Sequence, residues 1–226
     1  MNRQGTLQDQ ERVVRIPVGA RELEGNLIVP ETPAGVVLFA HGSGSSRHSS
    51  RNRFVARELQ EAGLATLLLD LLTAEEEAVD NQTRHLRFDI GMLAERLVHA
   101  TRWLGQNPDT RDLTVGYFGA STGGGAALVA AADDPDPIGA VVSRGGRPDL
   151  AGEALPRVRA PTLLIVGGDD IPVIGMNREA MARMSSAEVK LEIVPGATHL
   201  FEEPGKLEIV ARLAREWFLR HLAAAS

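Results

Sequence analysis

The sequence predicts a mostly parallel, doubly wound α/β sheet of about eight strands flanked by helices. Two observations lead to this fold class. Short apolar runs alternate with longer helical patterns along most of the chain, and the six later runs are almost wholly apolar. Nearly continuous apolar runs are typical of parallel strands covered on both faces. The first two runs alternate apolar and polar residues instead, which indicates an antiparallel pair at a sheet edge.

The expected elements follow from these runs in chain order. The edge pair covers Val13 to Val18 and Leu23 to Val29, with Gly19 and Ala20 between them. The parallel strands are predicted at residues 35–40, 65–70, 115–120, 140–143, 162–166 and 189–194. Helices are predicted at residues 54–62, 90–104, 122–132, 174–184 and 207–222. The second helix shows the clearest apolar stripe, which Ile90, Leu93, Leu97, Ala100 and Leu104 form at helical spacing.

A single domain over residues 1–226 is the simplest organisation. The chain has 226 residues, of which 43% are hydrophobic, and a chain of this size can bury about 70% of its surface in one core. The segment from Arg144 to Pro161 is too short for a helical lid domain. The irregular stretch from Leu72 to Phe88 is the candidate for a cap. Its acidic run, Glu75 to Glu77, is interpreted as a solvated face.

Composition narrows the class of protein. The chain has 30 acidic and 24 basic residues, so its net charge is −6. The absence of a basic patch argues against nucleic acid partners. Without cysteine, disulfides, thiolate metal sites and a cysteine nucleophile are excluded. No run of about 20 apolar residues is present, and the polar segment Met1 to Gln10 lacks the apolar core of a signal peptide. We therefore expect a cytoplasmic monomer or small homo-oligomer that does not bind membranes and acts on a small molecule.

A serine nucleophile is predicted at the turn Gly119-Ala120-Ser121-Thr122-Gly123. This G-x-S-x-G motif follows a predicted strand and opens a predicted helix, as a nucleophile elbow does. The sharp turn leaves no room for side chains at its flanks, which explains Gly119 and Gly123. The hydroxyl of Ser121 would stand at a helix N-terminus, where partial positive charge favours a developing oxyanion.

A dinucleotide-binding loop is the alternative interpretation of the same glycines. Gly119, Gly123 and Gly125 fit the spacing of short-chain reductases, and Arg144 could bind a 2′-phosphate. However, the motif lies in the middle of the chain, whereas a dinucleotide-binding fold has it near the start. The Tyr-x-x-x-Lys pair of such reductases is also missing, because Tyr117 is the single tyrosine and no lysine follows at that spacing. We therefore favour the nucleophile.

The loop from His41 to Ser46 is expected to supply one of two oxyanion donors. Acyl transfer needs two converging backbone N–H groups, one from the residue after the nucleophile and one from the first β-α loop. These are assigned to Thr122 and Ser43, with Gly44 as the second choice. His41 is interpreted as a structural residue that bridges backbone groups of the loop, and the base role is the less favoured reading.

The acid and the base are predicted after two late strands. Chain order in this type of site is serine, then carboxylate, then histidine. The strand at 162–166 ends in Gly167-Gly168-Asp169-Asp170, and Asp170 is preferred because it reaches further into the loop above the sheet; Asp169 is the fallback. The strand at 189–194 ends in Pro195-Gly196-Ala197-Thr198-His199, so His199 is the expected base.

With these motifs, the chain resembles the dienelactone hydrolase family of the α/β-hydrolase superfamily over nearly its whole length. The resemblance rests on His41-Gly42-Ser43-Gly44 and on the segments that hold Ser121, Asp170 and His199. It implies the α/β-hydrolase fold and a triad of these three residues, with Asp170 spaced as G-x-x-D. The namesake enzymes use a cysteine nucleophile, whereas this chain has Ser121. The resemblance therefore carries the fold and the triad, but not activity on dienelactones.

The predicted function is a serine hydrolase of small carboxylic esters, lactones or thioesters that works through an acyl-enzyme. It requires no organic cofactor and no metal. Two alternatives stay open: an acyltransferase or perhydrolase that uses the same triad, and a binding protein without turnover. Arg144 and Gly44 are candidate substrate contacts. Arg47, Arg51 and Arg53 follow strand ends, as Arg144 does, and all four could bind a substrate carboxylate through two hydrogen bonds. For such arginines, exposure to solvent or pairing with nearby acids is the more common role.

Overall fold

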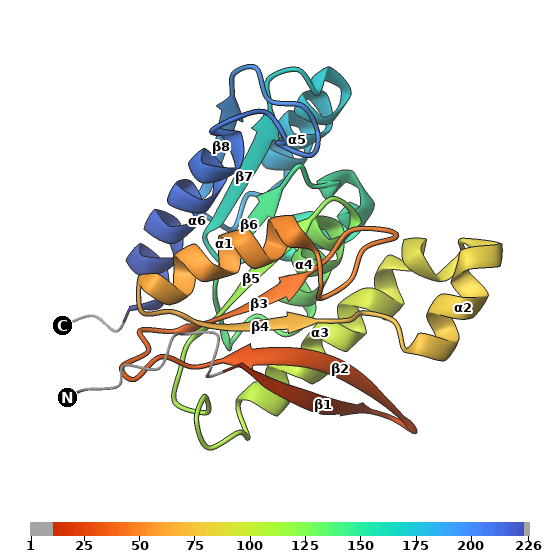
Figure 1. Ribbon diagram of the computed structural model, residues 1–226. Coiled ribbons are helices and arrows are strands. Elements are labelled where there is room, and N and C mark those ends of the chain that lie inside the picture. The colour runs from red at the N-terminus through yellow and green to blue at the C-terminus, as the bar shows by residue number, and fades with distance from the viewer. Residues whose placement is uncertain (1–10, 224–226) are drawn as a thin grey trace.

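The computed structural model describes residues 11–223, in which eight strands form one sheet in the order β1-β2-β4-β3-β5-β6-β7-β8 (Figure 1). β2 is antiparallel to both of its neighbours, β1 and β4, and all later pairs in this order are parallel. The predicted α/β sheet with an antiparallel edge pair is thus confirmed. The segment Met1 to Gln10, on which the signal-peptide expectation depends, lies outside the described residues. The strands are β1 (Arg12–Val18), β2 (Arg21–Ile28), β3 (Val36–Ala40), β4 (Ala65–Leu69), β5 (Val115–Ala120), β6 (Ile138–Arg144), β7 (Thr162–Gly167) and β8 (Val189–Val194).

Helices cover both faces of the sheet (Figure 1). α1 and α6 pack on one face, and α3, α4 and α5 lie on the other. The prediction placed the start of the first helix four residues too late, because Ser49 accepts a hydrogen bond from the Asn52 backbone N–H and begins the helix earlier. The helices are α1 (Ser50–Glu61), α2 (Ala74–Thr83), α3 (Ile90–Leu104), α4 (Thr122–Asp133), α5 (Ile171–Arg183) and α6 (Lys206–Leu222).

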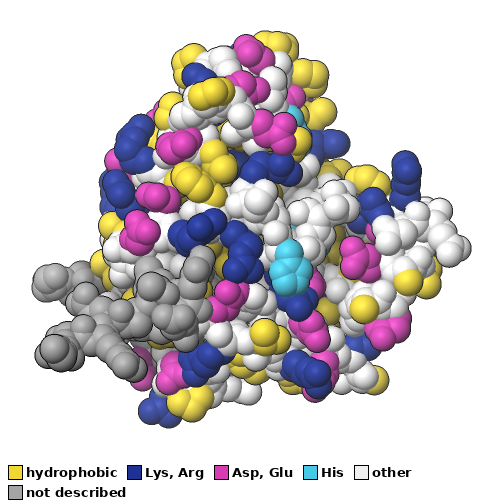
Figure 2. Space-filling model, viewed as in Figure 1, with side chains coloured by type: hydrophobic (Ala, Val, Ile, Leu, Met, Phe, Trp, Pro, Cys, Tyr) yellow, Lys and Arg dark blue, Asp and Glu magenta, His cyan; other side chains and the backbone are white. Residues whose placement is uncertain are grey.

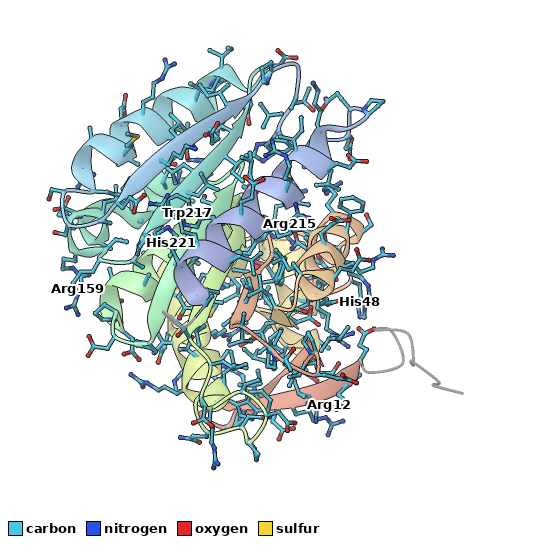
Figure 3. All side chains as sticks on the ribbon, turned by 90° about the vertical axis from the view of Figure 1, so that its left-hand side faces the viewer. Arg12, His48, Arg159, Arg215, Trp217 and His221 are labelled. Carbon is cyan, nitrogen blue, oxygen red and sulfur yellow. The ribbon has the colours of Figure 1, made fainter. Side chains whose placement is uncertain are left out.

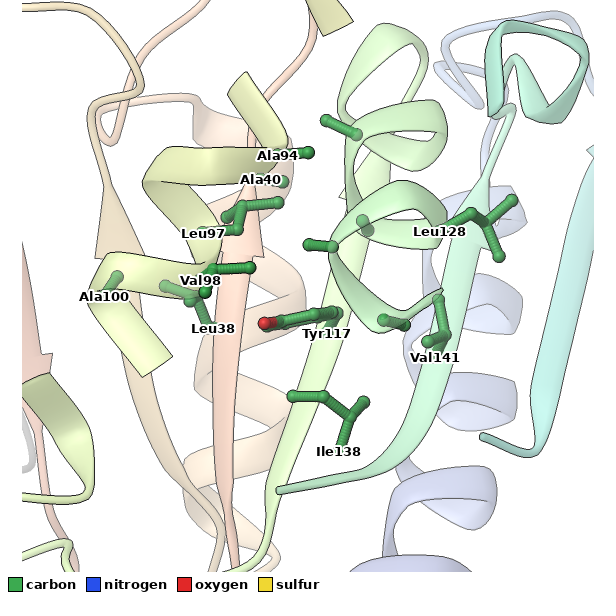
Figure 4. Close-up of a cluster of buried hydrophobic side chains, with 14 of the residues drawn as sticks. Leu38, Ala40, Ala94, Leu97, Val98, Ala100, Tyr117, Leu128, Ile138 and Val141 are labelled. Atoms are coloured by element: carbon green, nitrogen blue, oxygen red, sulfur yellow. The ribbon is translucent and has the colours of Figure 1, made fainter. Parts of the chain in front are cut away.

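The core lies in two apolar layers, one on each side of the sheet. Figure 4 shows the layer in which Leu38, Leu97, Tyr117 and Val141 pack between the sheet and two helices. Tyr117 is fully buried, and its hydroxyl lies 2.6 Å from the Thr101 hydroxyl. A buried phenol needs such a partner, so the single tyrosine of the chain serves packing here.

The stretch from Leu72 to Phe88 is more ordered than expected. It contains α2 and the 3-10 turn η2 (Leu86–Phe88). Thr73 and Glu76 form a capping box that begins α2. The interpretation of the acidic run as a solvated face is wrong for Glu76, which is buried and forms two hydrogen bonds of 2.6 and 2.7 Å with Arg96.

The segment from Arg144 to Pro161 contains a second element that was not predicted. The 3-10 segment η3 (Pro148–Arg157) packs against α4 and α5. On the opposite side of the sheet, α6 carries Trp217 and His221, whose ring centroids are 4.5 Å apart (Figure 3). These contacts close the sheet on both faces and leave the carboxyl ends of its parallel strands as the place for a site.

Charges of both signs are interspersed over the face of the molecule that Figure 2 shows. Within residues 11–223, every helix is too short or too polar to cross a bilayer.

Candidate active site

Ser121 stands on the sharp turn between β5 and α4. Its backbone has φ of 51° and ψ of −121°, a conformation that residues with a side chain rarely adopt. The Ser121 N–H donates to the Arg144 carbonyl at 3.2 Å, and the Arg147 N–H donates to the Ser121 carbonyl at 3.0 Å. The turn is thus held from both sides by backbone hydrogen bonds to β6 and the loop after it. Strain maintained in this way is typical of a functional position.

The two flanking glycines are required by space. A Cβ atom added to Gly123 would lie 2.2 Å from the Ala40 carbonyl oxygen, and one added to Gly119 would lie 2.5 Å from the Gly123 carbonyl oxygen. Both distances are far below van der Waals contact. The crowding that the sequence motif indicates is therefore present on both sides of Ser121.

Three side chains from distant parts of the chain meet beside this turn. The Ser121 hydroxyl lies 3.4 Å from Nε2 of His199. Nδ1 of the same ring donates to Oδ2 of Asp170 at 2.7 Å. The first distance is long for a hydrogen bond, as is common before substrate binds, and the second is short enough to fix the ring tautomer. The arrangement can move a proton from a hydroxyl to an imidazole that a carboxylate orients.

The structure brings Asp170, and not Asp169, to the histidine. Both follow β7, but the Asp169 backbone N–H donates to the Ala197 carbonyl at 3.0 Å, while Asp170 begins α5 with its carboxylate on His199. The loop that carries His199 is itself held by Glu203, which accepts hydrogen bonds from the Thr198 N–H at 3.1 Å and the Thr198 hydroxyl at 2.5 Å. Glu203 was not among the residues predicted from sequence patterns.

The loop after β3 lies against the nucleophile turn. A Cβ atom on Gly42 would be 3.2 Å from Cβ of Ser121. The hydroxyls of Ser43 and Thr122 are 3.0 Å apart, so the loop is joined to the first residue of α4. This places the two residues expected to supply oxyanion donors next to each other. Gly44, the second choice, lies further along the loop with φ of 68°.

His41 has the structural arrangement that the sequence analysis favoured. Its Nδ1 donates to the Gly42 carbonyl at 2.9 Å, and its Nε2 accepts from the Leu71 N–H at 3.0 Å. Burial lowers the pKa of His41 below its ordinary value. The ring therefore has the predicted structural role, but it bridges backbone groups of two loops and not of its own loop alone.

Two cavities adjoin the turn, and the loop residues Gly42, Ser43 and Ser45 line both. The first, the Leu93 pocket, has a volume of about 440 Å³. The second, the Arg144 cavity, has a volume of about 580 Å³. The other residues of the Leu93 pocket are His41, Gly44, Ser46, Asp70, Leu71, Leu72, Glu77, Asp80, Arg87, Leu93 and Thr122. The other residues of the Arg144 cavity are Ser49, Arg51, Asn52, Ala120, Ser121, Arg144, His199 and Leu200.

The segment with α2 and η2 forms one wall of the Leu93 pocket through Leu72, Glu77, Asp80 and Arg87. Burial alone would raise the pKa of Asp80, but hydrogen bonds from Arg87 outweigh it and lower that pKa. A carboxylate that stays ionised beside a guanidinium ties η2 to α2. The candidate cap segment thus forms a side wall of this pocket, and its polar wall residues were not recognised from the sequence.

The four arginines after strand ends divide into two groups. Arg47 pairs with Asp70 and with Glu24, and Arg53 pairs with Glu11 at 3.0 Å. Arg51 pairs with Glu202 at 2.9 Å and also lines the Arg144 cavity. The expectation that such arginines pair with acids is confirmed for these three. Arg144 differs, because no carboxylate of residues 11–223 lies within 4.0 Å of its guanidinium.

The fold defines the class of protein: it is an α/β-hydrolase fold. A family model described as the dienelactone hydrolase family matches residues 23–222, and the chain belongs to that family. A crystal structure of a dienelactone hydrolase from Anabaena variabilis is 65% identical, with a TM-score of 0.92 over 94% of this chain and 98% of that one.

More distant relatives extend the comparison. Est1E from Butyrivibrio proteoclasticus is 17% identical, with a TM-score of 0.74 over 92% of this chain and 98% of the other, and shows the fold alone. Two curated proteins of Mycobacterium tuberculosis, provisionally named phosphoribosyl transferases, are each 59% identical over 96% of this chain. The match covers 47% of each of them, so this chain spans about half the length of those relatives.

Proposed function

We propose that this chain is a serine hydrolase that cleaves small carboxylic esters, lactones or thioesters. Ser121 is the nucleophile, His199 the general base and Asp170 the residue that orients His199. The proposal rests on one observation above the others: His199 lies between the two, 3.4 Å from the Ser121 hydroxyl and 2.7 Å from the Asp170 carboxylate. Dienelactone hydrolase family membership supports the same class of reaction.

The reaction proceeds in two steps of acyl transfer. Nε2 of His199 takes the hydroxyl proton while Oγ of Ser121 bonds to the substrate carbonyl carbon. Backbone N–H groups of Ser43 and Thr122 donate to the oxyanion, and the N-terminus of α4 adds partial positive charge. When the bond to the leaving oxygen or sulfur breaks, His199 returns its proton to that atom.

Water completes the cycle. It attacks the acyl carbon, gives a proton to His199 and releases the carboxylic acid as that proton passes to Oγ of Ser121. The Asp170 carboxylate stabilises the imidazolium that forms twice in each cycle. The chemistry needs no metal and no organic cofactor.

Small substrates are favoured because the two cavities offer little apolar surface. Their large apolar side chains are Leu71, Leu72 and Leu93 in the Leu93 pocket and Leu200 in the Arg144 cavity. The transferase name of the curated relatives belongs to proteins about twice as long as this chain. For the half that this chain matches, we assign ester hydrolysis.

Labelling with a fluorophosphonate probe tests the proposal, because such probes react with activated serines. Wild-type protein should label and hydrolyse short esters, and Ser121→Ala should do neither. Ser186→Ala is the matched control, since Ser186 is exposed and donates only to the Pro156 carbonyl. Folded wild-type protein that neither labels nor hydrolyses any short ester or lactone would favour a binding protein. Added alcohol or peroxide that captures most of the acyl group would favour the acyltransferase or perhydrolase.

A further inference from the structure

β8 is an outer strand of the sheet. It pairs with β7 on one side and stands last in the strand order, so its other side has no strand beside it within residues 11–223. Figure 3 looks onto this side of the molecule and shows β8 crossing between α5 and α6. An outer strand presents a row of backbone N–H and C=O groups with which a further strand can pair.

Every second residue of β8 directs its backbone groups outward. The Glu188 and Val194 carbonyls each accept a hydrogen bond of 2.8 Å from a backbone N–H at one end of β7. Because the direction of the backbone groups alternates along a strand, the residues between these two alternate as well. The groups that point away from β7 are therefore those of Val189, Leu191 and Ile193.

The side chains of β8 divide into an apolar row and a charged pair. Val189, Leu191 and Ile193 are half-buried and pack on the side of the sheet that α5 covers. Lys190 and Glu192 lie on the opposite side, where Nζ of the lysine is 2.6 Å from Oε1 of the glutamate. Their side chains are 58% and 32% exposed. The outer strand thus carries one charge of each sign, two residues apart.

This pattern is complementary to itself when two copies of β8 pair antiparallel about a two-fold axis at Leu191. Leu191 then lies opposite its own copy, and Val189 lies opposite Ile193. These residues direct their backbone groups outward, so they occupy the hydrogen-bonded positions of the pair. Lys190 lies opposite Glu192 at the closer positions, where opposite charges attract across the strands. The two-fold axis repeats this ion pair.

β1, the strand at the other edge of the sheet, does not have this complementarity. It contains Pro17, which has no N–H to donate and is typical of an outer strand that avoids pairing. Its charged residues are Arg12 and Arg15, with no acid in the strand to oppose them. β8 has no proline and has charges of both signs. Of the two edges, β8 is therefore the one suited to pair with itself.

We propose that two copies of this chain associate through β8, so that one continuous sheet runs through both. A lone lysine on an outer strand opposes pairing with any other strand. The acid two residues along instead makes pairing with a second copy favourable. The apolar rows of both copies would be buried between their two α5 helices. The strand that leads to His199 would thereby gain a second neighbour. The inference does not depend on the proposed function.

The mass in solution tests the proposal. Gel filtration with light scattering and sedimentation velocity, at concentrations up to about 100 µM, should show wild-type dimers that dissociate on dilution. Lys190→Glu and Glu192→Lys each place like charges opposite one another and should raise the Kd of the dimer at least about 10-fold. Arg12→Glu and Asp109→Lys are the matched controls. They change the charge equally at an exposed ion pair of 2.8 Å on the far edge and should leave the dimer unchanged (Figure 3).

A mixture of the two single variants locates the contact between copies. Each Lys190→Glu copy carries two acids in β8, and each Glu192→Lys copy carries two lysines. The two variants should therefore form a heterodimer, recovered through an affinity tag on one of them, although neither forms a stable dimer alone. The ion pair within a single strand is broken in both variants, so recovery on mixing must come from contact between copies. The double variant should dimerise as the wild type does.

Hydrogen exchange gives a second measurement. The N–H groups of Val189, Leu191 and Ile193 should exchange at least about 10-fold more slowly in wild-type protein than in Lys190→Glu. Wild-type protein that is monomeric at every concentration would overturn the proposal. Dimers that persist in both single variants, or exchange rates that are equal in the two proteins, would overturn it as well. If the variants do not fold, the wild-type mass and its exchange rates decide the question.

Discussion

Nε2 of His41 accepts a hydrogen bond from the Leu71 backbone N–H at 3.0 Å, which joins the end of β3 to the end of β4. The same ring donates through Nδ1 to the Gly42 carbonyl. Both bonds require the neutral imidazole with its proton on Nδ1. The loop that holds Ser43 therefore depends on the protonation state of a residue that takes no part in the proposed reaction.

Stability should fall as this imidazole is forced to protonate. Burial lowers the pKa of His41 below the ordinary 6.5, so below pH 6.5 the unfolded chain binds a proton that the folded chain does not. The free energy of unfolding must then decrease as pH falls through that window. Urea unfolding between pH 8 and pH 5 should show a shallower decrease for His41→Gln than for wild type. Parallel curves for the two proteins would contradict this account.

The buried pair of Arg96 and Glu76 should contribute strongly to stability. Arg96 is 4% exposed. Arg96→Met would leave the Glu76 carboxylate buried without its main cationic partner and should lower the free energy of unfolding by about 3 to 5 kcal/mol. Arg21 also contacts Glu76, at 3.2 Å, but its side chain is 64% exposed, so Arg21→Met should cost less than about 1 kcal/mol. Denaturant titration measures both. Equal losses of unfolding free energy in the two variants would show that burial does not determine how much each ion pair contributes.

Gly123→Ala should damage the nucleophile turn. The added Cβ would lie 2.2 Å from the Ala40 carbonyl oxygen, and such overpacking costs at least about 2 kcal/mol. Gly175→Ala, within α5, is the control because its Cβ would meet no atom within 4 Å. That change should stabilise the protein by about 0.5 to 1 kcal/mol. Thermal unfolding and probe labelling of both variants measure these effects. If Gly123→Ala kept the wild-type unfolding temperature and labelling, the turn would tolerate the added Cβ atom and this account would be wrong.

Asp170→Asn should lower kcat for a short ester by about 10⁴-fold, because the amide favours the wrong tautomer of His199. Asp169→Asn should stay close to wild type, since the link of Asp169 to the Ala197 carbonyl uses only its backbone N–H. Steady-state kinetics on p-nitrophenyl acetate compare the two. A larger loss in the Asp169 variant would reassign the acid.

Acyl chain length should matter because the Leu93 pocket offers a long acyl chain little apolar surface, with Leu71, Leu72 and Leu93 as its large apolar side chains. We expect p-nitrophenyl acetate to be cleaved faster than the palmitate ester, and Leu93→Ala to shift the preference toward longer chains. Faster cleavage of palmitate by the wild type would contradict the preference for small acyl groups.

Sequence patterns predicted those elements whose own residues contain the signal. Residues 90–104 carry an apolar stripe, and residues 115–120 form a continuous apolar run; both elements begin and end where expected. The helix α2 was missed because its sequence has no apolar face. It is stabilised by a capping box and by the tertiary pair of Glu76 with Arg96, and a local pattern cannot reveal a partner 20 residues away.

The candidate site divides in the same way. Ser121 and His199 could be predicted because motif and chain order agree. Asp170 could be predicted because one other carboxylate, that of Asp169, follows the same strand. The distinction between Arg144 and Arg47 could not be made from sequence. Both follow strand ends, and only the folded chain brings Asp70 and Glu24 to Arg47 while leaving Arg144 without an acid among the described residues.

The backbone link between Ser121 and Arg144 bears on any redesign of this protein. The Ser121 N–H and the Arg144 carbonyl share one hydrogen bond, and Ala120 is aligned with Arg144 across neighbouring strands. An insertion or deletion in β6 would place another residue opposite Ala120 and disturb the hydrogen bond that holds the turn. Exchange of the side chain at position 144 leaves that hydrogen bond in place. Engineering of the cavity beside Ser121 should therefore proceed by point substitution and not by changes in the length of β6.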